Sequence, residues 1–224
     1  MISVIIPILN EAETIGGTLD ALAGLPGNLE VIVVDGQSHD DSVDIARKRG
    51  ALVLSGTRGR GQQLRVGAEH AKGEVLWFLH ADSVPSPEAL ARIDEAVRLP
   101  DVAGGNFDLL FAGSSTGARM LTRIYPHLRK LGLSYGDSGI FVRRDSYDAA
   151  GGFRAYPIFE DLDLMKRVRK QGRFVHLKAT IITSSRRFEN GNFALVFAKW
   201  TALQILYWAG VNPTTLGRWY SIVR

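Results

Sequence analysis

Apolar and polar positions alternate along the first hundred residues in a pattern typical of strands followed by helices. Apolar runs predict strands at residues 3–8, 29–35, 51–55 and 73–79, and periodic segments predict helices at residues 11–22, 38–49, 62–72 and 87–98. The run at 29–35 is almost continuously apolar, which indicates burial on both faces, as in a parallel sheet. Strand-helix repetition at this spacing predicts a doubly wound α/β fold with a mostly parallel central sheet flanked by helices.

The second half of the chain is less regular. We expect strands at residues 102–111 and 139–143, helices at 116–131 and 160–171, and two short strands at 173–177 and 180–184 that pair with each other. Asn10, Ser38 and Ser86 are predicted to cap the helices that follow them. With 224 residues and no linker-like stretch, the chain predicts one main domain that spans residues 1–190.

Residues 193–211 form an aromatic-rich segment in which only Lys199 and Gln204 are strongly polar. Three interpretations stay open, namely a helix buried on the sheet, a helix on a membrane surface, and a membrane span. Lys199 near the middle disfavours the span, and the neighbouring Trp and Tyr residues suit an interface. We therefore expect residues 191–224 to form helices packed on the domain or on a membrane surface, with peripheral membrane contact through 193–211.

Composition narrows the class of partner. The net charge is +4, but the basic residues are dispersed and are not interleaved with aromatic residues for base stacking, so we expect no nucleic-acid partner. A small phosphorylated ligand or an anionic membrane surface fits this excess better. The absence of cysteine excludes thiolate metal sites and fits a reducing compartment. The N-terminus resembles a first strand and not a signal peptide. We expect a cytoplasmic protein, at the inner face of the plasma membrane if the tail binds lipid.

Candidate functional side chains follow the ends of the predicted strands. His80 and Asp82 come directly after the strand at 73–79, so both can point toward one metal ion. Asp35 ends the second strand, directly before Gly36. At this position an open sheet binds a nucleotide, and the alternative is that Asp35 caps the helix that follows. Glu11 follows the first strand, where a first-turn acid also suits the helix dipole.

Two further segments carry charge suited to catalysis. Arg58 and Arg60 alternate with glycines before a helix, which suits phosphate, although a solvated basic loop is the alternative. The segment has neither the P-loop nor the dinucleotide-binding glycine pattern. Glu160 and Asp161 open a predicted helix. Asp161 is a candidate general base, with a helix-dipole role as the alternative.

The ordered segments PILNE, VVDGQS, GRGQQ, LHADS, GDSGIFVRR, GGF and FEDLDLMKR resemble glycosyltransferase family 2 over about residues 2–190. The resemblance implies a GT-A fold in which Pro7 and Glu11 line the nucleotide pocket and Asp35 contacts the base. It also implies that Asp82 holds a divalent metal, Mn or Mg, with His80 in place of the first acid of the DxD motif. Asp161 matches the residue that deprotonates the acceptor hydroxyl. The resemblance further assigns five residues to the donor-sugar and acceptor pocket: Gly136, Asp137, Gly152, Phe153 and Glu160.

The resemblance implies an inverting, non-processive glycosyltransferase that uses a nucleoside-diphosphate sugar, with UDP favoured over GDP. The QxxRW motif of processive synthases is absent. The acceptor is a hydroxyl on a small molecule or on a lipid-linked molecule. LHADS together with GDSGIFVRR is similar to a bacterial subgroup associated with arsenosugar biosynthesis. The alternatives are a nucleotidyltransferase and a non-catalytic nucleotide-sugar or membrane-binding module.

Overall fold

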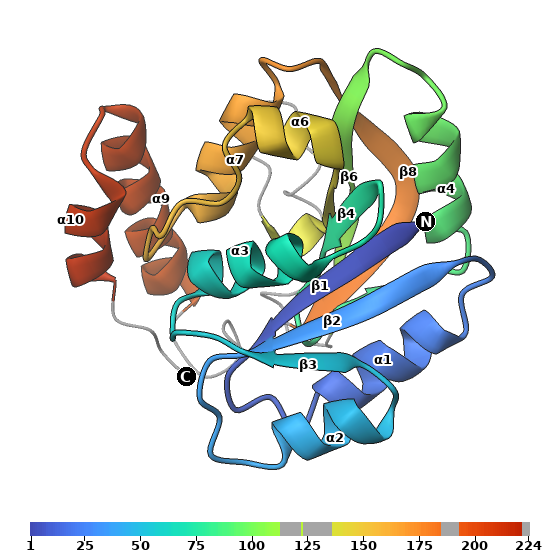
Figure 1. Cartoon of the computed structure of the whole chain (residues 1–224). Helices are drawn as coiled ribbons and strands as arrows, with labels where there is room; N and C mark the ends of the chain where they lie inside the picture. Colours follow the sequence, from blue (N-terminus) through green and yellow to red (C-terminus); the bar gives the residue numbers. More distant parts are fainter. Residues whose placement is uncertain (113–121, 123–135, 185–192, 221–224) are drawn as a thin grey trace.

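The computed structural model describes residues 1–112, 122, 136–184 and 193–220. One mixed sheet in these residues has the order β3-β2-β1-β4-β7-β6-β8-β5 (Figure 1). Its parallel half consists of β1 (Ile2–Ile8), β2 (Leu29–Asp35), β3 (Leu52–Ser55) and β4 (Val75–Phe78). The other half consists of β5 (Val84–Pro85), β6 (Val102–Ala112), β7 (Ile140–Arg143) and β8 (Arg173–Ser184). β7 runs antiparallel to both β4 and β6, so it joins the two halves.

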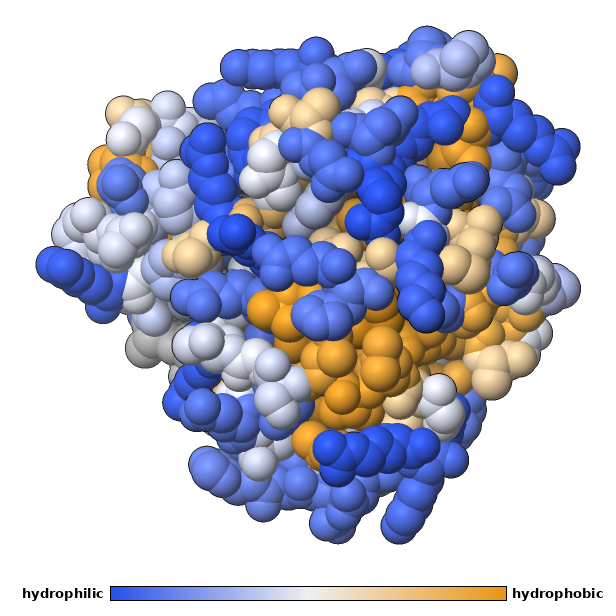
Figure 2. All heavy atoms as spheres, viewed as in Figure 1, coloured by the Kyte–Doolittle hydropathy of each residue, from blue (hydrophilic) through white to orange (hydrophobic). Residues whose placement is uncertain are grey.

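Helices cover both faces of the sheet, and each face has its own apolar core. On one face lie α1 (Ile15–Ala23), α2 (Ser42–Lys48) and α4 (Ala89–Val97). On the other lie α3 (Arg60–His70), α6 (Arg144–Ala149), α7 (Glu160–Val168), α9 (Phe193–Trp208) and α10 (Pro213–Trp219). The predicted α/β class with a flanked, mostly parallel sheet is confirmed. Helices cover the sheet less completely near its β3 edge, where Leu52 is 49% exposed. Figure 2 shows apolar surface beside α3.

The three predicted helix caps are wrong, and α1, α2 and α4 begin later than predicted. The Asn10 side-chain oxygen accepts a hydrogen bond from His39 N at 2.9 Å, and the Ser38 hydroxyl accepts one from Asn10 N at 2.9 Å. These bonds join the loops after β1 and β2. The Ser86 hydroxyl accepts a hydrogen bond from Thr180 N at 3.1 Å. Each side chain therefore satisfies a backbone group of another segment in place of its own helix.

The predicted pairing of residues 173–177 with 180–184 is also wrong. Both segments belong to the single strand β8, which runs parallel to β6. The register shifts between Phe107 and Asp108, whose partners are Leu177 and Thr180, so residues 178 and 179 form an irregularity that separates the two apolar runs. Of the helix predicted at 116–131, only residue 122 lies within the described residues.

The C-terminal helices pack on the chain just before α7. Phe159 contacts Trp200 and Tyr207 of α9 at ring-centroid distances of 5.7 Å and 5.0 Å, and Trp200 contacts Tyr220 at 5.7 Å. Leu203 is buried on the same side. No helix in the described part of the chain is long and apolar enough to cross a membrane. The side chains of residues 193–197 lie outside the description.

Candidate functional site

The carboxyl ends of β1, β2, β3 and β4 meet at one edge of the sheet. In register, Ile8 pairs with Asp35, and Asp35 pairs with Ser55. β2 and β4 flank β1 on opposite sides, so the strand order reverses at β1, and open α/β sheets bind ligands at such a switch point. Of the predicted residues, Asp35 ends β2, and His80 and Asp82 follow β4 at this edge.

Asp35 is 9% exposed, and its carboxylate accepts hydrogen bonds from Gln37 N at 3.2 Å and Ser38 N at 3.1 Å. It therefore shapes the turn after β2. The nearby Gln63, to which we had assigned no role, donates from Nε2 to Ile8 O and to Val34 O at 2.8 Å each. A Cβ atom on residue 36 would lie 3.0 Å from the Gln63 amide. Gln63 thus joins the ends of β1 and β2 and explains the glycine after Asp35.

Pro7 and Glu11 lie on the other side of the same turn. Pro7 is half-buried in β1. The Glu11 backbone N–H donates to the Ser42 hydroxyl at 2.7 Å, and its carboxylate accepts from the Thr14 hydroxyl at 3.0 Å. Both residues are at the edge that the sequence predicted, and their contact with a nucleotide stays a prediction.

A buried charged cluster joins the start of α3 to the start of α7. Arg60 Nη1 lies 3.2 Å from Glu160 Oε1. Glu160 is 4% exposed, and burial raises the pKa of its carboxyl group, against the opposing effect of the Arg60 guanidinium. Burial alone would lower the pKa of Arg60, but Glu160, Asp161 and Asp137 outweigh it and raise that pKa. The structure thus brings together four residues that the sequence predicted separately.

Asp161 is 7% exposed and is held at the first turn of α7. Its Oδ2 accepts a hydrogen bond from Gly136 N, at 2.5 Å, and its Oδ1 accepts one from Leu162 N at 2.7 Å. A Cβ atom on residue 136 would overlap Arg60 Nη2 and would lie 2.8 Å from Asp161 Oδ2. Gly136 therefore permits the close approach of η1 (Gly136–Ser138) to the cluster.

Gly61 lies in the first turn of α3 and faces the chain before α7. A Cβ atom there would lie 2.5 Å from Arg154 O and 3.2 Å from Glu160 Cβ. Gly61 allows α3 to approach the chain before α7 closely. Gly59 has a φ of 140°, which favours glycine. Arg58 is exposed and has no ion-pair partner among the described residues.

His80 and Asp82 have different neighbours. His80 Nε2 lies 3.0 Å from Asp137 Oδ1 but is not aligned for a hydrogen bond. This buried nitrogen has no hydrogen-bond partner in the part of the chain that the structure describes. Asp82 Oδ1 accepts a hydrogen bond from the Thr183 hydroxyl at 3.1 Å. No three His, Asp or Glu side chains within the described ranges form a complete metal site. Asp137, which we had predicted as a pocket residue, is thus the acid nearest His80 Nε2.

A hydrogen-bonded group that the sequence did not reveal supports η1. Asn106 is 2% exposed, and its Nδ2 donates to the Ser138 hydroxyl at 3.1 Å. Its Oδ1 lies 3.0 Å from His176 Nδ1, and His176 Nε2 lies 3.0 Å from Asp108 Oδ1. Asn106 lies within an ordinary strand pattern, so no local signal could have identified it.

Gly152 and Phe153 lie behind the charged cluster. A Cβ atom on Gly152 would lie 3.1 Å from the Tyr147 ring, and Gly152 has a φ of 62°. Phe153 is 1% exposed and packs edge-on against Phe78 at a centroid distance of 4.9 Å. Both residues belong to the packing below the site, and their role in a sugar or acceptor pocket stays a prediction.

Known proteins with similar sequences include glycosyltransferases. The "Glycosyltransferase AglE" of Haloferax volcanii is 29% identical over 168 residues, which cover 68% of this chain and 55% of that protein. The undecaprenyl-phosphate 4-deoxy-4-formamido-L-arabinose transferase of Aeromonas hydrophila is 32% identical over 43% of this chain and 33% of that protein. The chain thus spans about half or less of the length of these relatives.

Two solved structures show the same fold. The mannosyltransferase PcManGT of Pyrobaculum calidifontis, in complex with GDP-Man and Mn²⁺, superposes with a TM-score of 0.73 at 21% identity, covering 94% of this chain and 64% of that one. S. aureus TarS 1–349 in complex with UDP-GlcNAc gives a TM-score of 0.67 at 18% identity, covering 86% and 60%. Residues 3–157 match the sequence profile of glycosyl transferase family 2. This chain therefore belongs to glycosyl transferase family 2 and has the GT-A fold.

Proposed function

We propose that this protein is an inverting, non-processive glycosyltransferase that moves a sugar from a nucleoside-diphosphate sugar, with UDP favoured, to a hydroxyl acceptor. The observation that carries the proposal is the placement of Asp161. Its carboxylate is held at the start of α7 beside Arg60 and η1, and this group adjoins the residues that follow β4 through the His80–Asp137 contact. We also propose that this chain belongs to the bacterial subgroup associated with arsenosugar biosynthesis, because its segments LHADS and GDSGIFVRR are similar to that subgroup.

In the proposed reaction, the acceptor oxygen forms a bond to the anomeric carbon while the bond from that carbon to the diphosphate breaks. The diphosphate leaves with the electron pair, and Asp161 takes the acceptor proton. General-base catalysis of this kind typically contributes about 10²- to 10⁴-fold to the rate. Arg58 and Arg60 supply positive charge for the diphosphate, and the protein contributes mainly positioning and charge stabilisation.

The residues after β4 fit a divalent metal shared with the donor. A ligand would satisfy the buried His80 Nε2, which has no hydrogen-bond partner, and Asp82 and Asp137 supply carboxylates nearby in the fold. An incomplete set of protein ligands leaves room for diphosphate oxygens. When bound, such an ion neutralises charge on the leaving diphosphate. One imidazole and carboxylates suit Mn²⁺ better than Mg²⁺.

The relatives' complexes support a nucleotide-sugar donor, since one holds GDP-Man and another UDP-GlcNAc. The undecaprenyl-phosphate transferase supports a lipid-linked acceptor as one alternative to a small soluble molecule. A nucleotidyltransferase is disfavoured, because the segment after β1 lacks a glycine-rich basic loop. A purely binding module is disfavoured because Asp82 and Asp161 are both present.

The first experiment is calorimetric titration of UDP and GDP with and without Mn²⁺, on the native protein and on Asp82→Ala. Metal-dependent UDP binding that the variant loses would support the donor site. Binding of neither nucleotide would reject it.

The second experiment tests the base. Asp161→Asn should bind UDP normally and lose about 10²- to 10⁴-fold in transfer or donor hydrolysis. Asp44→Asn, at an exposed carboxylate of α2, is the matched control. Full activity in Asp161→Asn would remove Asp161 from the proposed mechanism, and the anomeric configuration of the product, read by NMR, tests inversion.

A further inference from the structure

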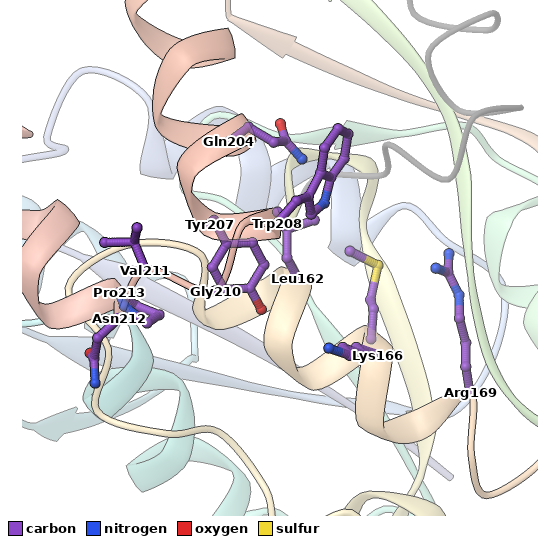
Figure 3. A pocket seen from close by; sticks show the side chains of 11 residues that line it. Leu162, Lys166, Arg169, Gln204, Tyr207, Trp208, Gly210, Val211, Asn212 and Pro213 are labelled. Carbon is purple, nitrogen blue, oxygen red and sulfur yellow. The ribbon is translucent and has the colours of Figure 1, made fainter.

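A cavity lies away from the charged cluster, between α7, α9 and the turn into α10 (Figure 3). Its volume is about 540 Å³. One wall comes from α7 and carries Leu162, Met165, Lys166 and Arg169, and the facing wall carries Tyr207 and Trp208. Figure 3 shows the two aromatic rings of α9 lying above the basic side chains of α7. The cavity therefore combines an apolar surface with two cations.

Neither cation of this cavity has an acidic partner among the described residues. Lys166 and Arg169 form no ion pair there, whereas the intervening Arg167 is paired with Asp163 at 2.5 Å. The Arg169 guanidinium carbon lies 5.1 Å from the Phe174 ring centroid. Arg169 is an exposed residue, but partial burial of its side chain lowers its pKa, and no carboxylate in the described part of the chain offsets that loss of hydration. An anion in the cavity would stabilise both cations.

The cavity opens beside an exposed apolar surface. Trp208, which lines it, is 58% exposed, and Ile205, one turn earlier on α9, is 55% exposed. Trp219 on α10, the helix that packs on α9, is 56% exposed. Among the described side chains of α9, the exposed side carries Ile205 and Trp208 beside Lys199 and Thr201, and the inner side carries Leu203 and Gln204. Exposed tryptophans next to cations are typical of helices at a lipid headgroup boundary.

We propose that α9 and α10 dock this protein on an anionic phospholipid bilayer, with a lipid phosphate held between Lys166 and Arg169 and with Ile205 and Trp208 in the interface. Charge complementarity favours this occupant. A symmetric contact with a second copy of the chain would place the same unpaired cations near each other, which disfavours self-association. A soluble phosphate would use the cations but would leave the aromatic surface in water. This inference is independent of the proposed transfer chemistry.

The test is flotation of the full chain with vesicles at low salt. Vesicles of equal parts phosphatidylcholine and phosphatidylglycerol should carry the native protein, and pure phosphatidylcholine vesicles should carry much less. Each basic residue near an anionic surface contributes about 1 kcal/mol, so the double variant Lys166→Gln/Arg169→Gln should bind roughly 30-fold more weakly. Trp208→Ala should bind less to both kinds of vesicle.

The matched control is Arg47→Gln/Lys48→Gln on α2, which removes the same charge from exposed positions on another side of the molecule (Figure 1). It should bind nearly as well as the native protein. Equal weakening in the two double variants would overturn the headgroup site, since net charge alone would then explain binding. No flotation of the native protein would overturn the docking surface, whether the protein instead dimerises in light scattering or binds soluble glycerol phosphate. Circular dichroism confirms that each variant is folded.

Discussion

Replacement of Gly61 by alanine should move the start of α7 and so test how the charged cluster is assembled. The new Cβ atom would lie 2.5 Å from Arg154 O, and real Cβ atoms essentially never come closer than 3.0 Å to such an atom. The neighbouring backbone must therefore move by roughly 0.5 Å or more, and overpacking of this kind costs about 1–3 kcal/mol. Alanine in a helix returns about 0.5–1 kcal/mol. The net expectation is a loss of about 0.5–2 kcal/mol, or roughly 2–6 °C in melting temperature.

The matched control for this substitution is Gly17→Ala in α1, where a Cβ atom would meet nothing within 4 Å. Only the helix-propensity gain applies there, so its melting temperature should rise by roughly 2–3 °C. Thermal and urea unfolding of both variants measure the difference. Because Gly61 faces Glu160, its variant should also lose more in kcat than in KM for donor hydrolysis. If Gly61→Ala proved as stable as Gly17→Ala, the close approach of α3 to α7 described above would be refuted.

Three further substitutions probe other parts of the fold. Asn106→Ala removes two hydrogen bonds worth about 0.5–1.5 kcal/mol each and should lower the free energy of unfolding in urea by about 1–3 kcal/mol, and an unchanged free energy of unfolding would contradict the support of η1. His80→Asp should shift metal-dependent UDP binding from Mn²⁺ toward Mg²⁺ in calorimetry, and an unchanged preference would remove His80 from the metal site. For Glu30, burial raises the pKa, but hydrogen bonds from Ser3 and two backbone N–H groups outweigh it and lower the pKa below its usual 4.5. The stabilisation that these hydrogen bonds give to the charged carboxylate is present above about pH 4.5 and is lost as the pH falls. Glu30→Gln should therefore lower the free energy of unfolding at about pH 7 and much less at about pH 3. Urea unfolding at both pH values measures the difference.

The Arg60–Glu160 pair has a consequence for donor binding. Arg60 is one of the arginines proposed to stabilise the diphosphate, yet without a donor it neutralises a buried glutamate. A buried charge that loses its partner is strongly destabilised. A diphosphate that recruited Arg60 would leave the Glu160 carboxyl either to share the guanidinium or to take up a proton, since burial already raises its pKa. The ion pair joins the start of α3 to the helix that carries Asp161.

Several site residues were predictable because their environment is local. Asp35, His80 and Asp82 each follow an apolar run that could only be a buried strand, and parallel strands bring their carboxyl ends to one edge. The residue pattern also placed Glu160 and Asp161 at a helix start, where the structure has them.

Other assignments failed because local propensity competes with distant partners. Asn10, Ser38 and Ser86 are good capping residues, yet each bonds to a segment far away in sequence. The two apolar runs of β8 looked like a hairpin because an irregularity at residues 178–179 interrupts the pattern of one strand. A hydrogen bond to a close neighbour in sequence is worth no more than one to a distant neighbour, so only packing decides between them.

The sequence by itself determined the order of strands and helices over residues 1–79, the buried faces of the parallel strands there, and the edge at which their candidate functional groups gather. These features follow from the spacing of apolar residues. Burial of one face of a helix or strand requires apolar residues that recur with the period of that element. Only the tertiary structure decided that Arg60 faces Glu160, that Asp161 is held by Gly136, that His80 faces Asp137, and that Asn106 supports η1. Each of these contacts joins residues more than 20 positions apart, and the close packing of separate elements selects them from many partners of similar chemistry.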